Sequence, residues 1–184
     1  MRICINEIET RAEDVPAHVR GTLTVEESDE ATLPQVQSVG DVDVCAGGEL
    51  SLPAATSVGN VCVCAGSVLF LPVALTVGHV EVCAGGSLSL PAATSVGDVD
   101  VWAGGSLSLP QAQSMGNVYV WAGGELSLPA AQTVGNVYVR ANGSLSLPQA
   151  QTVRNVLVWA GGSLRIPAGC AVGKISGSGL VERL

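Results

Sequence analysis

A proline recurs every 19 residues through most of this chain, and this spacing restricts the possible folds more than any other feature. The surrounding residues repeat as well, most clearly in residues 95–112, SVGDVDVWAGGSLSLPQA. A fixed period without insertions indicates one structural unit copied in tandem, so the fold must be a repeat architecture. The prolines are Pro34, Pro53, Pro72, Pro91, Pro110, Pro129, Pro148 and Pro167.

Each period contains two short segments with the alternation of β-strands, V-x-V and L-x-L. Gly-Gly and Pro separate them, which leaves no room for a helix. A single 19-residue unit could not bury its apolar face, whereas stacked units could do so with parallel strands about 4.8 Å apart. We therefore predict an all-β parallel β-solenoid of about eight coils. Residues 21–172 would form the repeat domain, 1–20 a cap or degenerate coil, and 173–184 a short C-terminal cap.

The interior of such a solenoid must be narrow, because the chain contains a single Phe and only 3% aromatic residues. Alternation predicts which residues of a coil point inward, and their equivalents should do the same in every other coil. The Ser/Thr positions that begin with Ser38 are expected at a corner, where hydroxyls can bond turn backbone groups. The predicted inward residues are Val42, Val44, Ala46, Leu50, Leu52, Ala55 and Val58.

The segment VGNVYVRANGSLSLP, residues 134–148, resembles a leucine-rich-repeat unit. Val134, Val137 and Val139 match its first apolar positions and Asn142 matches its turn asparagine. TSVGN at 56–60 and TSVGD at 94–98 are similar to receptor-L-like, single-strand β-helices. The resemblance covers roughly residues 21–173 and implies a right-handed solenoid that binds proteins or glycans on a strand-lined surface. The chain departs from the pattern by using Val for Leu and, in most coils, Gly for the asparagine, at Gly47, Gly66, Gly85, Gly104, Gly123 and Gly161.

Charge is distributed unevenly along the chain. The net charge is −8; residues 21–139 contain 11 acidic residues and no Lys or Arg, whereas residues 140–184 contain five basic residues and one acid, Glu182. An acidic body disfavours phosphate backbones, so we expect no direct nucleic-acid binding. The N-terminal residues do not resemble a secretory signal and no long apolar stretch is present, so we predict a cytoplasmic protein without membrane association. Its six cysteines are then expected to be free thiols.

Function is expected where the repeat stops being uniform, on the outward side of the valine-rich strands. Every Trp and Tyr falls there. Aromatic residues could simply stabilise a cross-strand ladder, but their confinement to one face, together with Arg, favours a binding surface. The predicted partner-binding residues are Trp102, Tyr119, Trp121, Tyr138, Arg140, Trp159, Asp98, Asp100, Asp41 and Asp43.

The sequence predicts no enzyme, metal site or cofactor. Cys45, Cys64 and Cys83 should form one column with Cys62 nearby, but parallel outward side chains converge poorly on one ion. Two histidines and no placeable nucleophile set argue against nucleophilic catalysis. The carboxylates of Asp41 and Asp43, and of Asp98 and Asp100, have a spacing that resembles glycosidase pairs, but we interpret them as solvated charge on a strand face.

The resulting hypothesis is a non-catalytic protein-binding module, which could act as an inhibitor of a larger machine. One alternative is an acidic mimic of nucleic acid that occupies a partner's DNA- or RNA-binding groove, as a phage-type antagonist of a host enzyme would, because ten acids fall within residues 21–101. A second is a carbohydrate-binding module that uses Trp102, Trp121 and Trp159. The apolar C-terminal end, with Leu180, Val181 and Leu184, is a candidate homodimer contact.

Overall fold

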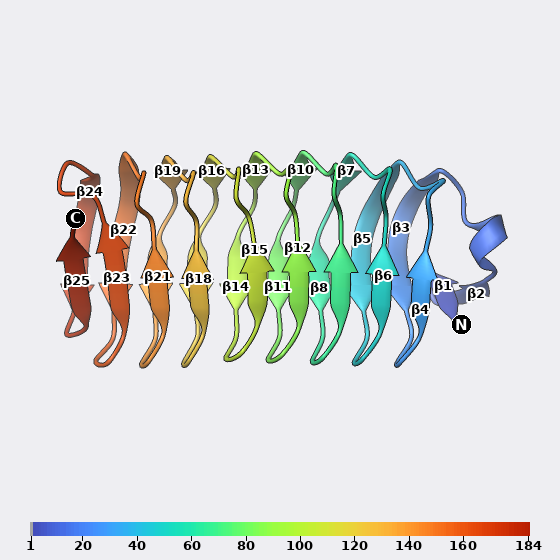
Figure 1. The fold of residues 1–184 in the computed structure, drawn as a ribbon, viewed down its shortest axis with the longest axis horizontal. Helices are drawn as coiled ribbons and strands as arrows, with labels where there is room; N and C mark the ends of the chain where they lie inside the picture. The colour runs from blue at the N-terminus through green and yellow to red at the C-terminus, as the bar shows by residue number, and fades with distance from the viewer. Residues whose placement is uncertain (1) are drawn as a thin grey trace.

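The repeated segments form short parallel strands stacked along a rod in the computed structural model, which describes residues 2–184 (Figure 1). The rod has about nine turns, which confirms the predicted all-β solenoid and adds one turn to the expected eight. One 3-10 helix, η1 (Ala12–Asp14), lies near the N-terminus. No helix within residues 2–184 is long and apolar enough to cross a membrane.

One long sheet contains two kinds of strand. The valine strands carry the V-x-V segments, and the corner strands precede them in each central coil. Valine strands are β5 (Ser38–Val44), β8 (Val61–Val63), β11 (Val80–Val82), β14 (Val99–Val101), β17 (Val118–Val120), β20 (Val137–Val139) and β22 (Thr152–Val158). Corner strands are β7 (Ser57–Val58), β10 (Thr76–Val77), β13 (Ser95–Val96), β16 (Ser114–Met115) and β19 (Thr133–Val134).

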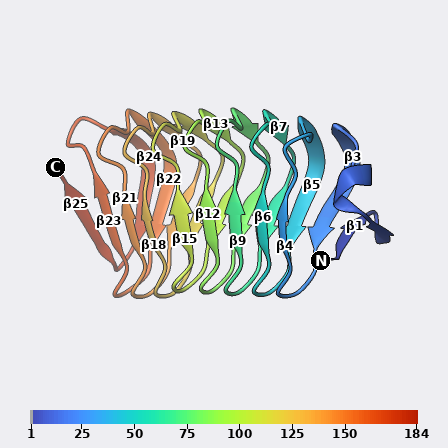
Figure 2. The ribbon, with the colours of Figure 1, turned by 45° about the vertical axis from the view of Figure 1, so that its right-hand side comes forward.

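The leucine strands carry the L-x-L segments and form the other side of the rod (Figure 2). They make two shorter sheets, one of five strands and one of four. Pairing follows the period, since Leu88 is in register with Leu69 on one side and Leu107 on the other. The first sheet has β4 (Glu30–Thr32), β6 (Glu49–Ser51), β9 (Val68–Phe70), β12 (Ser87–Ser89) and β15 (Ser106–Ser108); the second has β18 (Glu125–Ser127), β21 (Ser144–Ser146), β23 (Ser163–Ile166) and β25 (Leu180–Arg183).

The two ends depart from the regular stack. At the N-terminal end, β1 (Ile3–Ile5) pairs antiparallel with β2 (Ile8–Thr10) and with β3 (His18–Val25). Strand β3 then pairs in parallel with β5 through a register shift between Val19 and Thr22. At the other end, β24 (Ala171–Gly177) pairs with β22, and β25 pairs with β23. Residues 173–184, expected to form a short cap, thus supply most of the additional turn.

The core consists of Val, Leu and Ala columns, as the alternation predicts. Five of the predicted inward residues of the second coil, together with Val58, are at most 5% exposed, and so are most of their equivalents. Ala46 is the exception, because it is exposed. The amide of Gly48 donates to the carbonyl of Cys45 at 2.8 Å, which closes a turn and leaves Ala46 at its tip. The prediction that Ala46 points inward was therefore wrong, since strand alternation ends at Cys45. The six residues that do point inward are Val42, Val44, Leu50, Leu52, Ala55 and Val58.

The same turn explains one set of glycines. Gly104 has a φ of +72°, which the third position of a type II turn requires and which L side chains rarely adopt. Asn142 occupies this position in its own coil with a φ of +59°, and Asn tolerates the left-handed region better than most residues. The substitution of Gly by Asn at this turn thus has a conformational basis.

A second glycine column lies where the coils approach most closely. A Cβ added to Gly97 would lie 2.8 Å from the backbone of Gly78, so a larger residue would push neighbouring coils apart. The adjacent Ser/Thr column lies in the corner strands, but its hydroxyls do not have the expected role of bonding turn backbone. Its members lie in strands, where Ser57 and Thr76 are exposed. It is the preceding position that bonds turn backbone, as Thr94 donates to the carbonyl of Leu75 at 3.4 Å.

Candidate functional site

The outward side chains of the valine strands form three parallel columns, which together we call the aromatic face. Val99 and Val101 point into the core, so Asp98, Asp100 and Trp102 project outward from the same coil. Parallel pairing in register repeats this arrangement in each coil. The first column is Asp41, Asn60, His79, Asp98, Asn117, Asn136 and Asn155; the second is Asp43, Cys62, Glu81, Asp100, Tyr119, Tyr138 and Leu157; the third is Cys45, Cys64, Cys83, Trp102, Trp121, Arg140 and Trp159.

The rings of adjacent coils are stacked. The ring centroids of Trp102 and Trp121 are 4.5 Å apart with planes within 3° of parallel. Those of Tyr119 and Tyr138 are 4.7 Å apart and within 5° of parallel. Because these separations match the spacing of paired strands, the backbone sets the stacking distance. The aromatic residues are therefore held in fixed positions along the face.

Arg140 continues the tryptophan stack. Its guanidinium carbon lies 5.1 Å from the ring centroid of Trp121 and 3.9 Å from that of Trp159. Both distances are in the range of cation–π contacts. A shallow groove runs beside this arrangement, lined by the three side chains together with Ala122 and Ala141.

Carboxylates of the second column anchor the indoles of the third. Trp102 Nε1 donates to Glu81 at 3.1 Å, and Trp121 Nε1 donates to Asp100 at 2.8 Å. Asp100 also lies 3.7 Å from His79 Nε2. Burial raises the pKa of Asp100 above its usual range, although the hydrogen bond from Trp121 partly opposes this shift. The pKa of Asp43 is also raised, by burial and then by the charge of Asp41.

The first column has a role that sequence reasoning missed. Asp41 accepts a hydrogen bond from the amide of Asn60 at 2.8 Å, and Asp98 accepts one from the amide of Asn117 at 2.6 Å. Asn117 in turn accepts from the amide of Asn136 at 2.9 Å. These side chains link one coil to the next at the position where the strand is interrupted. Asp41 and Asp98, predicted as partner-binding residues, therefore serve as inter-coil hydrogen-bond acceptors.

Four of the six cysteines, Cys45, Cys62, Cys64 and Cys83, occupy the N-terminal half of the same face, and all six are free thiols. Burial, and then the neighbouring Cys64, raises the pKa of Cys62 to about 12, and burial also raises the pKa values of Cys45 and Cys83. Such thiols stay protonated at neutral pH, which makes them poor nucleophiles. Within residues 2–184, no group of three or more His, Cys, Asp or Glu side chains is arranged to hold a metal ion.

The predicted site residues are thus brought onto one face, but their exposure differs. Trp102 is 37% exposed, whereas Trp121, Trp159 and Arg140 are half-buried in the stack. Tyr119 and Tyr138 are half-buried as well. A partner would thus meet ring edges along most of the face and the largest aromatic exposure at Trp102.

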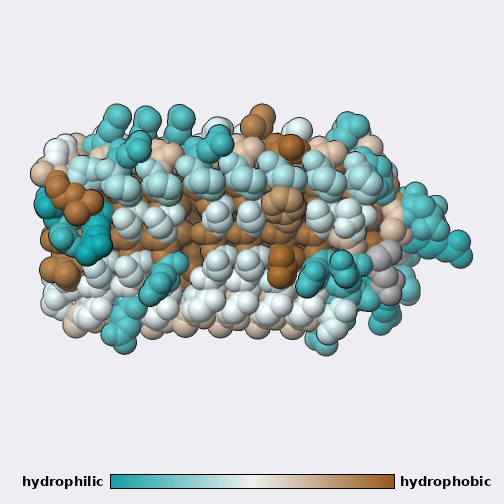
Figure 3. All heavy atoms as spheres, viewed as in Figure 1, coloured by the Kyte–Doolittle hydropathy of each residue, from teal (hydrophilic) through white to brown (hydrophobic). Residues whose placement is uncertain are grey.

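An apolar patch on the opposite side was not predicted as a site. It consists of Val68, Phe70, Val73 and Leu75, which are 39–51% exposed and come from one coil. Figure 3 shows brown atoms interrupting the pale rows of small polar side chains on this side. The sequence signal was the run VLFLPVAL, where other coils have SLSLPAAT or a close variant.

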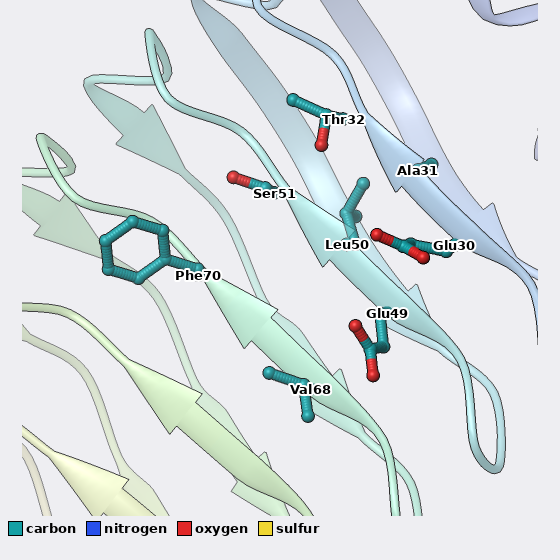
Figure 4. Close-up of a pocket in the computed structure, with 8 residues that line it drawn as sticks. All are labelled: Glu30, Ala31, Thr32, Glu49, Leu50, Ser51, Val68 and Phe70. Atoms are coloured by element: carbon teal, nitrogen blue, oxygen red, sulfur yellow. The ribbon is translucent and has the colours of Figure 1, made fainter.

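A small pocket adjoins this patch across β4, β6 and β9 (Figure 4). Glu30, Glu49 and Val68 form one row of side chains across the three strands, and Thr32, Ser51 and Phe70 form a second. The patch is therefore bordered by two carboxylates. At the C-terminal end, Ile175, Leu180 and Leu184 are also exposed, by 42%, 61% and 56%.

The fold and the stacked face define a parallel β-solenoid with an ordered aromatic surface. No family model matches the sequence, and no curated protein matches it. Among solved structures, the TibC-catalysed hyper-glycosylated fragment of TibA, residues 55–350, is similar with a TM-score of 0.49 and 18% sequence identity, over 89% of this chain and 72% of that one.

Proposed function

We propose that this chain is a non-catalytic protein-binding module and that the aromatic face is its contact surface. The observation that carries the proposal is the ordered stack of Trp102, Trp121, Arg140 and Trp159 beside the Tyr119–Tyr138 pair. Trp, Tyr and Arg are the residue types that contribute most to protein interfaces. Side chains already held in place lose little conformational entropy on binding, which favours affinity.

Further features support a protein partner. The resemblance to leucine-rich-repeat solenoids implies binding through a strand-lined surface. Sugars stack on ring faces, and here most faces of the tryptophans are covered by another ring or by Arg140, which disfavours the carbohydrate alternative. The free thiols fit a reducing compartment such as the cytoplasm. Blocking a larger machine, as an inhibitor does, would need no chemistry beyond this contact.

The test is capture of a partner by the immobilised chain from a lysate of its native host. Wild type and a Trp102→Ser/Trp121→Ser variant are compared, with Phe70→Ser as the matched control because Phe70 is an aromatic residue on the opposite side. We expect wild type and the control to capture the same protein and the double variant to lose it. Undiminished capture by a thermally destabilised double variant would show that the stack only stabilises the fold.

Mimicry of nucleic acid is the second candidate, favoured by the absence of Lys and Arg between residues 21 and 139. Its acids are divided between two sides of the rod, with Glu30 and Glu49 on leucine strands and Asp43 and Asp100 on valine strands. Binding by a mimic should weaken steeply with salt, because it depends on charge. Binding through the aromatic stack should weaken with salt much less steeply, so the slope of a salt titration of the captured complex separates the two.

A further inference from the structure

A guanidinium group of the chain itself, that of Arg140, is bound within the tryptophan stack. Along the third column, consecutive coils supply Trp102, Trp121, Arg140 and Trp159, one planar group per coil. The guanidinium of Arg140 occupies one of these slots between two indoles, at 5.1 and 3.9 Å from their centroids. Strand spacing therefore creates slots in which a guanidinium fits against tryptophan.

The stack is open at its other end. The preceding coil places Cys83 in the column, a much smaller side chain than an indole. Trp121 covers one face of the Trp102 ring, and no other ring or guanidinium within residues 2–184 stacks on Trp102. Trp102 is also the most exposed of the stacked groups, at 37%. Within residues 2–184, one face of the Trp102 indole is thus left unstacked, and the neighbouring position of the column holds only the short side chain of Cys83.

The surroundings of this slot are negative. Glu81 bonds the Trp102 indole at 3.1 Å, and Asp100 lies in the following coil of the same column. Residues 21–139 contain no Lys or Arg, so the only nearby base is His79, 3.7 Å from Asp100. Between Trp121 and Trp159 the chain supplies its own cation, Arg140, whereas the Trp102 end of the stack has two acids and no Lys or Arg. Burial raises the pKa of Asp100, as expected for a carboxylate without a strong cationic neighbour.

We propose that the open face of Trp102, together with Glu81 and Asp100, receives an arginine side chain of the protein partner. The guanidinium stacks on the indole as Arg140 stacks on Trp159, and its N–H groups donate to a carboxylate. Arginine suits the slot better than lysine, because its planar, weakly hydrated guanidinium can stack on the indole and also donate two hydrogen bonds to a carboxylate. This inference rests on the proposed function and specifies the chemistry of its partner.

The test is a titration of the ¹⁵N-labelled chain followed by its three tryptophan indole N–H signals, with Trp102 assigned from a Trp102→Phe variant. The probes are the capped peptides Gly-Arg-Gly, Gly-Lys-Gly and Gly-citrulline-Gly, the last being a neutral near-isostere of the first. We expect the arginine peptide to shift the Trp102 signal saturably, the lysine peptide to bind more weakly, and the citrulline peptide to have no effect. Glu81→Gln, which keeps an acceptor for the indole, should weaken arginine binding about fivefold, whereas Glu125→Gln on β18 should not.

Two outcomes overturn the proposal: equal shifts with arginine and citrulline, or unchanged arginine affinity in Glu81→Gln with its native circular dichroism intact. Failure here is distinguishable from failure of the proposed function. A partner captured only when Trp102 and Trp121 are present, combined with no effect of the arginine peptide on Trp102, would retain the aromatic face as an interface and reject arginine as its ligand.

Discussion

Single polar side chains hold neighbouring coils together at the first column of the aromatic face. Asn117 accepts from the amide of Asn136 at 2.9 Å and from its Nδ2 at 3.0 Å, while its own Nδ2 donates to Asp98 at 3.3 Å. Each short strand offers few backbone bonds, so these side chains replace ladder bonds where the strand is broken. Asp41, Asn60, Asp98 and Asn117 each accept a hydrogen bond from the backbone amide one coil further along.

Asn117→Ala should lower the free energy of unfolding by about 1–2 kcal/mol, because it removes one hydrogen-bonding side chain from three partners. Urea denaturation measures the change. The control is Ser127→Ala, at an exposed outward position of β18, which should be nearly neutral. An Asn117→Ala variant as stable as this control would mean that solvent replaces the ladder without loss.

Asp43 should make stability depend on pH. Burial and the charge of Asp41 raise its pKa in the folded chain, so the folded state binds this proton more tightly than the unfolded state. The stabilising contribution of the protonated carboxyl is complete below the usual value of 3.8 and disappears as the pH rises through the raised value. At pH 7 the ionised group is therefore unfavourable, and Asp43→Asn should raise the melting temperature.

This advantage should shrink as the pH is lowered toward 3.5, where wild type is also largely neutral at this position. Melting temperatures of both proteins at pH 7 and 3.5 provide the measurement. Glu125→Gln removes an equal charge from a leucine strand and controls for net charge. A stabilisation by Asp43→Asn that is the same at both pH values would exclude titration of Asp43 as its cause.

At the scale of the strand, alternation predicted the buried side of the valine and leucine strands correctly. It failed at Ala46, because β5 ends at Val44 and Cys45 already belongs to the turn that its bond with Gly48 closes. Alternation describes extended backbone and contains no information about where a turn begins. The Gly-Gly pair marked the turn but did not indicate which of its neighbours would lie at the tip.

Only part of the candidate site could be predicted, because strand register gives the face on which a side chain lies but not the group that it bonds. Strand register is enough to place the Trp, Tyr and Arg side chains on one face, because identical periods stack residue on residue. The same register could not distinguish Asp98, which bonds a neighbouring amide, from Asp100, which bonds an indole. Both are outward acids in sequence, and only the break between the corner strand and the valine strand separates their roles. The apolar patch around Phe70 appears in the sequence as the run VLFLPVAL. Sequence alone does not show that four of these residues are exposed, so the run resembles a segment of the core.

At the scale of the whole molecule, sequence order is spatial order, since the chain advances along the rod from N- to C-terminus (Figure 1). The absence of Lys and Arg between residues 21 and 139, followed by five basic residues, therefore becomes an electrical asymmetry along the axis. The transition falls within the aromatic face, at Arg140. Under the proposed function, this asymmetry would orient a partner along the rod before it contacts the rings.

Stacking of equivalent coils also predicts how the rod tolerates deletion. Removing Ala65–Cys83 deletes one complete 19-residue period and joins Cys64 to Ala84, which restores the CAGG turn and keeps every valine and leucine in its column. Each coil contacts only its neighbours, so we expect a cooperatively folded rod, shorter by about 4.8 Å in small-angle scattering. Its urea m-value should fall by about a tenth, in proportion to the surface lost.

The control deletes nine residues, Ala65–Val73, which shifts the strands out of register and should abolish cooperative unfolding. If the full-period deletion unfolds the chain as severely as this control, then stability depends on particular coils rather than on the repeated contact between them.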